Sequence, residues 1–129
     1  MNLLPFHDMH AQDETAVKQV VTQFIASTDQ QDATALVATL HDKAMQYVLF
    51  GSSVLTFNKE EYLTQVKDKK VGGKPRTIEW HESLFSGDAL VTVKLKATSA
   101  VLVFNYQITL MKSGEAWVIN AITTHVERV

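Results

Sequence analysis

The spacing of hydrophobic residues changes from a helical to a strand-like period about halfway along the chain. Residues 14–30 carry apolar side chains at the intervals of one helical face, and Asp13 before them is a suitable N-cap. Two further helices are predicted, a short one after Asp32 and another after Asn58, where Glu61 completes a capping-box pattern. The expected buried positions are Val17, Val20, Val21, Phe24, Ile25 and Thr28 in the first helix, and Leu36, Val37 and Leu40 in the second.

The remaining hydrophobic segments have the length and alternation of β-strands. A hairpin is predicted over residues 45–50 and 54–57, joined by a turn at Gly51. Four longer strands are predicted over residues 76–86, 89–97, 101–112 and 116–126. Because helices dominate the first half and strands the second, the order of elements predicts an α+β fold.

Two glycine-containing turns predict how the long strands pair. A two-residue loop at Gly87-Asp88 would place Trp80 opposite Leu95, and one at Ser113-Gly114 would place Leu110 opposite Trp117. In these registers one face of the sheet is almost continuously apolar, and a slip of one residue would turn it outward. The polar residues predicted on this inner face are Glu82, Tyr106, Thr123 and His125.

Two of these residues are candidates for acid–base chemistry. A histidine titrates near neutral pH, and burial raises the pKa of a carboxyl group such as that of Glu82, so a convergent pair could transfer protons. The alternative for His125 is a structural histidine that hydrogen-bonds a backbone carbonyl. The alternative for Glu82 is a salt bridge, or a strand bulge that turns its side chain outward.

A second group of residues is expected to line a cavity and bind a ligand. These are Trp80, Tyr106, Thr123, Phe24 and Tyr47. The Tyr106 hydroxyl could donate a hydrogen bond to a ligand carbonyl, whereas the alternative is that these aromatic side chains only pack in the core.

The outer face of the last two strands is only partly polar. Apolar Val103, Met111, Val118, Ile122 and Val126 are expected there among Asn and Gln side chains. Because soluble proteins rarely leave such a face uncovered, the pattern predicts a homodimer through the outer sheet face.

Composition narrows the function classes. The chain has 129 residues, a net charge of −2 and no cysteine, which fits one domain and excludes disulfides and thiolate chemistry. The net charge does not indicate a nucleic-acid partner, and no apolar run is long enough for a membrane span. Residues 1–12 lack the basic cluster and the apolar run of a signal peptide, so a cytoplasmic protein is expected. Residues 1–12 are predicted to be a flexible tail preceding the domain at 13–129. No metal site is predicted, because His7 and His10 lie in this tail, and no cofactor motif is present.

A basic segment at residues 67–76 precedes the long strands. It contains Lys67, Lys69, Lys70, Lys74 and Arg76 together with two glycines. It is interpreted as a solvated loop, with a mobile lid or an anion contact as the alternatives.

Several segments in this order resemble the NTF2-like (nuclear transport factor 2-like) superfamily, and within it the SnoaL-like and putative lumazine-binding group. They are residues 40–44 after the second helix, 86–89 between strands, 105–110 on the third long strand and 114–119 on the last. The resemblance implies a cone with three N-terminal helices packed in the concave face of a curved, mostly antiparallel sheet, usually a homodimer, and small hydrophobic ligands. One departure is Val48, which stands about where ketosteroid isomerase-type members carry a catalytic Asp.

Three functional hypotheses follow. The leading one is a protein that binds a small hydrophobic or aromatic molecule in an apolar pocket with a few polar groups. The second is a cofactor-independent dehydratase, isomerase or polyketide cyclase-like enzyme that uses His125 and Glu82. The third is a protein-interaction domain whose cavity is filled by its own side chains.

Overall fold

The computed structural model describes residues 11–129, in which a β-hairpin separates the first two helices from the third and four long strands follow. The helices are α1 (Ala11–Asp29), α2 (Ala33–Val37) and α3 (Lys59–Lys67). The strands are β1 (Leu40–Phe50), β2 (Ser53–Asn58), β3 (Thr77–Phe85), β4 (Leu90–Thr98), β5 (Leu102–Ser113) and β6 (Ala116–Arg128). Most of the predicted tail, including His7 and His10, lies outside the described residues, and residues 11 and 12 begin α1 instead of belonging to that tail.

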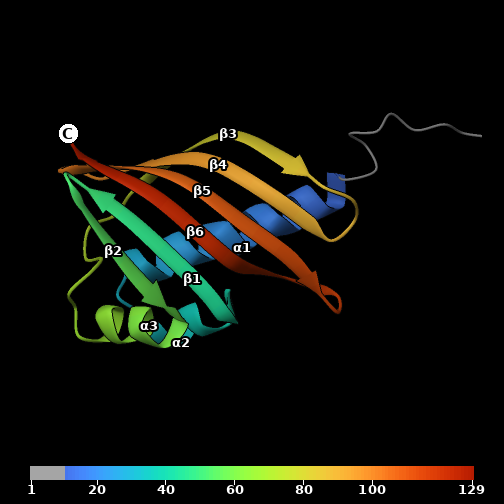
Figure 1. Cartoon of the computed structure of the whole chain (residues 1–129), viewed down its shortest axis with the longest axis horizontal. Coiled ribbons are helices and arrows are strands. Elements are labelled where there is room, and N and C mark those ends of the chain that lie inside the picture. Colours follow the sequence, from blue (N-terminus) through green and yellow to red (C-terminus); the bar gives the residue numbers. More distant parts are fainter. Residues whose placement is uncertain (1–10) are drawn as a thin grey trace, which may run out of the picture.

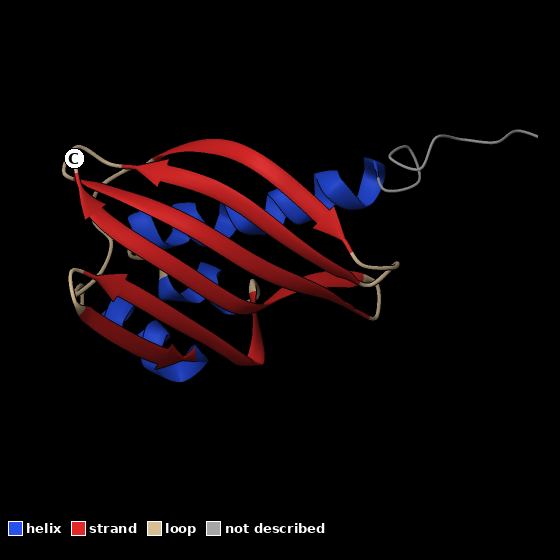
Figure 2. Cartoon of the chain, turned by 45° about the horizontal axis from the view of Figure 1, so that its top comes forward, coloured by secondary structure: helices blue, strands red, loops and turns tan. Residues whose placement is uncertain are grey.

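The strands form one curved sheet in the order β2-β1-β6-β5-β4-β3. All neighbours are antiparallel except β1 and β6, which pair in parallel although they are far apart in the sequence. The sheet wraps around the helices, with α1 running along its concave side (Figures 1 and 2). The predicted α+β architecture is therefore confirmed. Within residues 11–129, no helix has the length and apolar composition needed to span a membrane.

The helices follow their sequence signals closely. Val17, Val21 and Phe24 are completely buried on the inner face of α1, where they pack against the sheet. Asn58 caps α3 as predicted: its side chain accepts a hydrogen bond from the Glu61 backbone at 2.8 Å, and the Glu61 carboxylate accepts one from the Asn58 backbone at 2.8 Å. Val37 is exposed, contrary to prediction, because α2 ends there and only Leu36 of this helix is buried.

A bulge in β3 changes which side chains face inward. Trp80 pairs with Leu95 as predicted, but Glu82 pairs with Lys94, so His81 is an extra residue in the ladder. Beyond the bulge Phe85 pairs with Val91, and the loop between β3 and β4 spans residues 86–89 instead of forming a two-residue turn. The side chains after the bulge are thereby turned to the opposite face from the predicted one.

A second bulge, at Asn120, has the same effect on β6. Leu110 pairs with Ile119 and Thr109 pairs with Ala121, which leaves Asn120 without a partner in the ladder. The turn itself is at Gly114-Glu115, because Ser113 pairs with Ala116. After the bulge, the buried residues are Ile122, Thr124 and Val126, and Thr123 and His125 are exposed.

The basic segment after α3 is fastened to the end of α1. The Gly73 backbone donates a hydrogen bond to the Asp29 carbonyl at 2.9 Å, and the Gln31 side chain donates one to the Val71 carbonyl at 3.1 Å. Gly72 has a φ of +82°, and a Cβ there would collide with the Thr28 carbonyl oxygen, so this close approach requires glycine. These contacts favour a fixed wall at this segment over a mobile lid.

Deletion of Thr123, a paired residue beyond the bulge, should destabilise the protein far more than deletion of Asn120. Loss of Thr123 would turn Thr124 and Val126 outward and His125 inward, which removes most of the roughly 5–15 kcal/mol of stability typical of a domain. Loss of Asn120, which has no partner in the ladder, leaves every later residue of β6 on its own face and should retain a cooperative urea transition measured by circular dichroism. Equal losses of stability in the two deletion variants would contradict the assigned register.

The substitution Gly72→Ala should destabilise the protein far more than Gly87→Ala. Both glycines have a positive φ, which costs an L-residue roughly 1–2 kcal/mol, but a Cβ on Gly87 meets nothing within 4 Å. The collision with the Thr28 carbonyl should bring the loss at Gly72 to about 4 kcal/mol. Urea denaturation of the two variants measures the difference, and equal losses would show that the segment does not pack against α1 as described.

Candidate functional site

A pocket of about 440 Å³ opens at the end of the sheet where the C-terminus lies. Its walls come from the end of α1, from α3, from the basic segment and from the inner faces of β1, β2, β5 and β6. Much of the lining is apolar, including Val48, Phe50, Leu55, Phe57, Phe104 and Val126. The polar lining is concentrated where α1, the basic segment and β5 meet.

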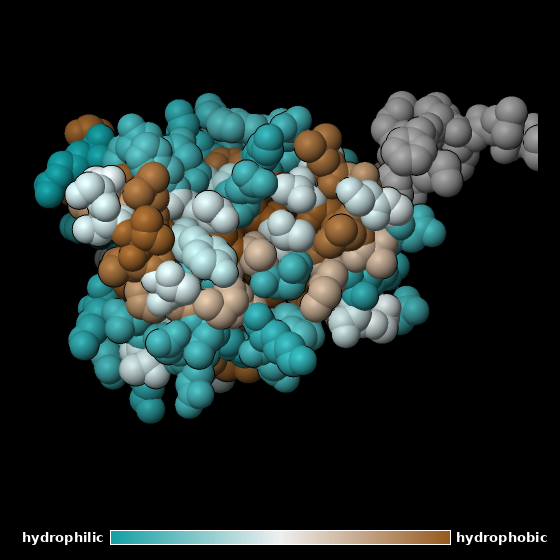
Figure 3. Space-filling view, viewed as in Figure 1, coloured by the Kyte–Doolittle hydropathy of each residue, from teal (hydrophilic) through white to brown (hydrophobic). Residues whose placement is uncertain are grey.

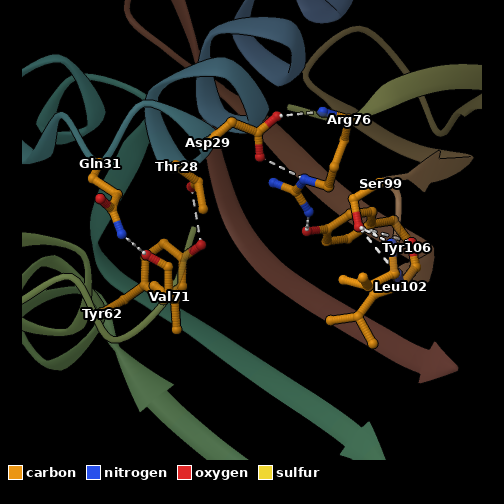
Figure 4. A network of polar contacts seen from close by, with 10 residues as sticks. Thr28, Asp29, Gln31, Tyr62, Val71, Arg76, Ser99, Leu102 and Tyr106 are labelled. Carbon is orange, nitrogen blue, oxygen red and sulfur yellow. Dashed lines mark hydrogen bonds and ion pairs between the residues drawn. The ribbon is translucent and has the colours of Figure 1, made fainter. Parts of the chain in front are cut away.

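Arg76 is the centre of the polar lining. Its Nε donates a hydrogen bond to Asp29 Oδ1 at 2.6 Å, and its Nη1 donates one to the Tyr106 hydroxyl at 2.6 Å (Figure 4). The backbone N–H of Arg76 donates to Asp29 Oδ2 at 3.0 Å, so both carboxylate oxygens are engaged. The arginine thereby joins the end of α1 to β5, and its side chain is only 4% exposed.

The guanidinium of Arg76 stays charged in this buried position. Burial by itself lowers the pKa of Arg76, but the neighbouring Tyr106 and Asp29 more than offset this effect and raise it above its usual value. The guanidinium carbon also lies 4.5 Å from the centre of the Phe104 ring, a distance at which a cation is attracted by the aromatic face. The pocket therefore contains a fixed cation.

Tyr62 forms the opposite wall. Its hydroxyl lies 3.0 Å from the Thr28 hydroxyl, and its ring stacks on Phe24 at 5.7 Å between centres. Burial raises the pKa of Tyr62 well above the ordinary value for a phenol, so this hydroxyl is neutral at physiological pH. The hydroxyl groups of Tyr62 and Thr28 hydrogen-bond to each other, and they make this wall of the pocket polar but uncharged.

Two nitrogens that belong to pocket residues have no hydrogen-bond partner. They are Arg76 Nη2 and Gln46 Nε2, and both are buried. In Figure 4 the Arg76 nitrogen without a dashed line points toward the space between Arg76 and the Thr28–Tyr62 pair. Buried donors in native proteins are nearly always paired, so these two are the strongest indication of a ligand.

The structure places the predicted ligand-binding residues in different surroundings. Tyr106 lines the pocket, and Phe24 lies beneath it, in ring contact with both Tyr62 and Tyr106. Trp80 instead faces a shallow groove beside α1, where Lys18 Nζ lies 5.4 Å from its ring centre. Tyr47 and Thr123 are exposed on the outer sheet face, and Thr124 occupies the pocket position that was predicted for Thr123.

The prediction that Glu82 and His125 lie on the inner face is wrong. Glu82 is exposed and lies 3.3 Å from Lys94, while the His125 ring is exposed and lies 3.6 Å from Glu127. The bulges at His81 and Asn120 are the physical reason, since each turns the following residues over. The two side chains stand on β3 and β6, which are separated by two strands.

The pocket residues that the sequence did not identify include Asp29, Gln46 and Tyr62. Asp29 is the last residue of α1, and in the sequence it resembles any polar residue at the end of a helix. Gln46 falls inside a predicted strand whose register was ambiguous. Arg76 belongs to the basic segment, for which the sequence favours a solvated loop and leaves an anion contact as one alternative. Among residues 11–129 there is no group of three or more His, Asp or Glu side chains that could hold a metal ion.

Comparison with solved structures shows that other proteins share this fold. An NTF2-like protein of unknown function from Silicibacter pomeroyi DSS-3 superposes with a TM-score of 0.80 at 13% identity, covering 91% of this chain and 98% of that one. A ketosteroid isomerase-like protein from Erwinia carotovora atroseptica gives 0.67 at 14% identity, with 89% and 95% covered. A cystatin-like protein of unknown function from Nostoc punctiforme gives 0.68 at 14% identity, with 98% and 96% covered. At these identities the likeness concerns the fold alone.

Sequence comparison identifies the family. No curated protein matches the chain. The family model described as putative lumazine-binding matches residues 12–123, which is most of the chain. This match shows that the chain belongs to the putative lumazine-binding family, and its fold is that of NTF2-like proteins.

Proposed function

We propose that the protein binds a small, largely apolar or aromatic molecule in the pocket between the β1–β2 hairpin and the basic segment. The observation that carries this proposal is a pocket whose walls are mainly apolar but which holds a buried, charged arginine with an unused donor. Its volume of about 440 Å³ is within the range usual for small-molecule sites. An apolar wall with few oriented polar groups is the typical composition of such sites.

The other two hypotheses have less support. A protein-interaction domain with a filled cavity would leave no space of this size beside α1 and α3. The acid–base mechanism that used Glu82 and His125 loses its basis, because neither residue lines the pocket. The Tyr106 hydroxyl lines it and already accepts a hydrogen bond from Arg76, an arrangement suited to positioning a ligand.

We also propose that two copies associate through the outer face of the sheet. Three exposed apolar side chains gather on the β1–β2 hairpin, namely Tyr47, Leu49 and Val54, with 44%, 38% and 63% of their surface exposed. Leu49 and Val54 are directly paired across the two strands, and this group is called the outer patch below. Figure 3, which views the molecule as Figure 1 does, shows brown and pale side chains across the middle of the face and teal side chains along its edges.

The surroundings of the outer patch support this interface. Thr123 and His125 lie beside Tyr47 and Leu49 on the neighbouring strand β6, so no Asp, Glu, Lys or Arg side chain pairs with these two apolar residues on that side. By contrast, the outer face of β3 and β4 carries charged side chains, including Glu79, Glu82, Lys94 and Lys96. The two ends of the sheet thus differ in character, and the end with β1 and β2 is the better candidate for burial against a second copy.

Filling the pocket should abolish ligand binding without unfolding the protein. Val48→Trp projects an indole into the pocket, whereas Tyr47→Trp places the same side chain on the opposite face of the same strand. Nile red, a neutral apolar dye, should bind the parent and the Tyr47→Trp variant and bind Val48→Trp at least about tenfold more weakly, by analogy with overpacked cores. Fluorescence titration measures the affinities. Equal binding by both variants would place the dye elsewhere and contradict the proposed pocket.

A charge in the outer patch should weaken the dimer. Leu49→Glu would bury a carboxylate in the proposed interface, whereas Leu84→Glu alters an equally apolar side chain, 51% exposed, that lies on β3 away from the patch. Size-exclusion chromatography with light scattering should give a dimer for the parent and Leu84→Glu and a monomer for Leu49→Glu. A monomeric parent at micromolar concentration would refute the interface.

A further inference from the structure

The two unpartnered donors in the pocket are unusual because they come from separate elements. Gln46 belongs to β1 and Arg76 lies just before β3, and these two strands are separated by β6, β5 and β4 in the sheet. Both side chains are nearly inaccessible, with 4% of Gln46 and 4% of the Arg76 side chain exposed. A protein that evolved only for stability would be expected to replace such donors with apolar groups, since an unmet buried donor costs free energy.

The charge of the pocket lining also distinguishes it from the rest of the molecule. The pocket lining contains three cationic side chains, those of Lys70, Lys74 and Arg76, and one carboxylate, that of Asp29. The net charge of the lining is therefore +2. The whole chain has a net charge of −2. Both oxygens of Asp29 are engaged by Arg76, and within the described residues the pocket has no other acidic group. The pocket therefore offers donors and positive charge and lacks a free anionic acceptor.

We propose that the ligand is an organic acid, with an apolar or aromatic body in the pocket and a carboxylate that accepts hydrogen bonds from Arg76 Nη2 and Gln46 Nε2. This inference rests on the proposed function and specifies its ligand class. A carboxylate has two acceptor oxygens and no donor, which matches two N–H donors from different side chains. Hydrogen bonds between a charged donor and a carboxylate are stronger than neutral ones, and Arg76 is already held in place by Asp29 and Tyr106.

The exposed lysines in the lining have a separate role. Lys70 and Lys74 belong to the basic segment that is fastened to α1, so their positive charge is held beside the pocket. Their charge attracts an anion as it approaches and contributes an electrostatic component that salt screens. Arg76 and Gln46, in contrast, act on the bound carboxylate, where water has less access.

Gln46 provides a test in which binding and stability change in opposite directions. In the substitution Gln46→Leu the unpartnered amide is replaced by an apolar side chain of similar size, so the free energy of unfolding should be unchanged or higher. The same change should weaken binding of a carboxylate ligand about tenfold, because one of its hydrogen bonds is lost. Gln107→Leu, at an exposed position on β5, is the matched control and should leave the affinity unchanged.

The ligand probes are cinnamate and cinnamamide, which share a planar aromatic body and differ in charge. Competition with Nile red should show cinnamate binding at least about tenfold more tightly than cinnamamide. Added salt should weaken the acid more than the amide, and the double variant Lys70→Gln/Lys74→Gln should reduce this dependence on salt. In Gln46→Leu, the preference for the acid should fall while the urea midpoint does not.

The possible results separate the two proposals. Equal affinity for the acid and the amide would overturn the carboxylate inference and leave the small-molecule pocket standing, provided that Nile red still binds. Loss of stability in Gln46→Leu, with an unchanged preference for cinnamate, would also overturn the inference by making Gln46 a structural residue. If neither probe nor Nile red binds, the proposed function fails together with the inference.

Discussion

The pairing of Asp29 with Arg76 is the interaction on which the pocket depends. A buried guanidinium is tolerated only when its charge is paired, and Asp29 provides that pair: its Oδ1 accepts a hydrogen bond from Nε and its Oδ2 accepts one from the backbone N–H of Arg76. Because Asp29 ends α1 and Arg76 precedes β3, this pair fixes the basic segment between them in space. Tyr106 takes a third donor, and the nitrogen that remains faces the pocket. The same contacts that hold the wall of the pocket thus orient its charged group.

The charged side chains of this pocket come from the end of α1 and from the basic segment, and β1 contributes no charged side chain to its lining. By the resemblance noted in the sequence, Val48 stands about where ketosteroid isomerase-type proteins carry a catalytic Asp, and it lines the pocket as an apolar side chain. The charged lining is supplied instead from the other side, by the end of α1 and the basic segment. This exchange makes the pocket richer in donors than in acceptors, which is the basis for inferring an acidic ligand.

The sequence predicted the elements well and the faces of two strands poorly. Helical spacing and the Asn58 capping box are local signals, and they correctly placed α1 and α3. The bulges at His81 and Asn120 are set by how strands fit into a curved sheet, so no local pattern revealed them. Each bulge turned over the residues after it, and His125, Thr123 and Glu82 were therefore assigned to the wrong face. The pairing of Asp29 with Arg76 joins residues 47 positions apart, which periodicity cannot detect.

Side-chain NMR during a titration with cinnamate follows the two proposed donors directly. The amide signal of Gln46 and the guanidinium signals of Arg76 should shift together and saturate at the same ligand concentration. The amide signal of Gln107, exposed on β5, should stay in place. Saturable binding that leaves the signals of Gln46 and Arg76 unmoved would contradict the assignment of these two donors to the ligand.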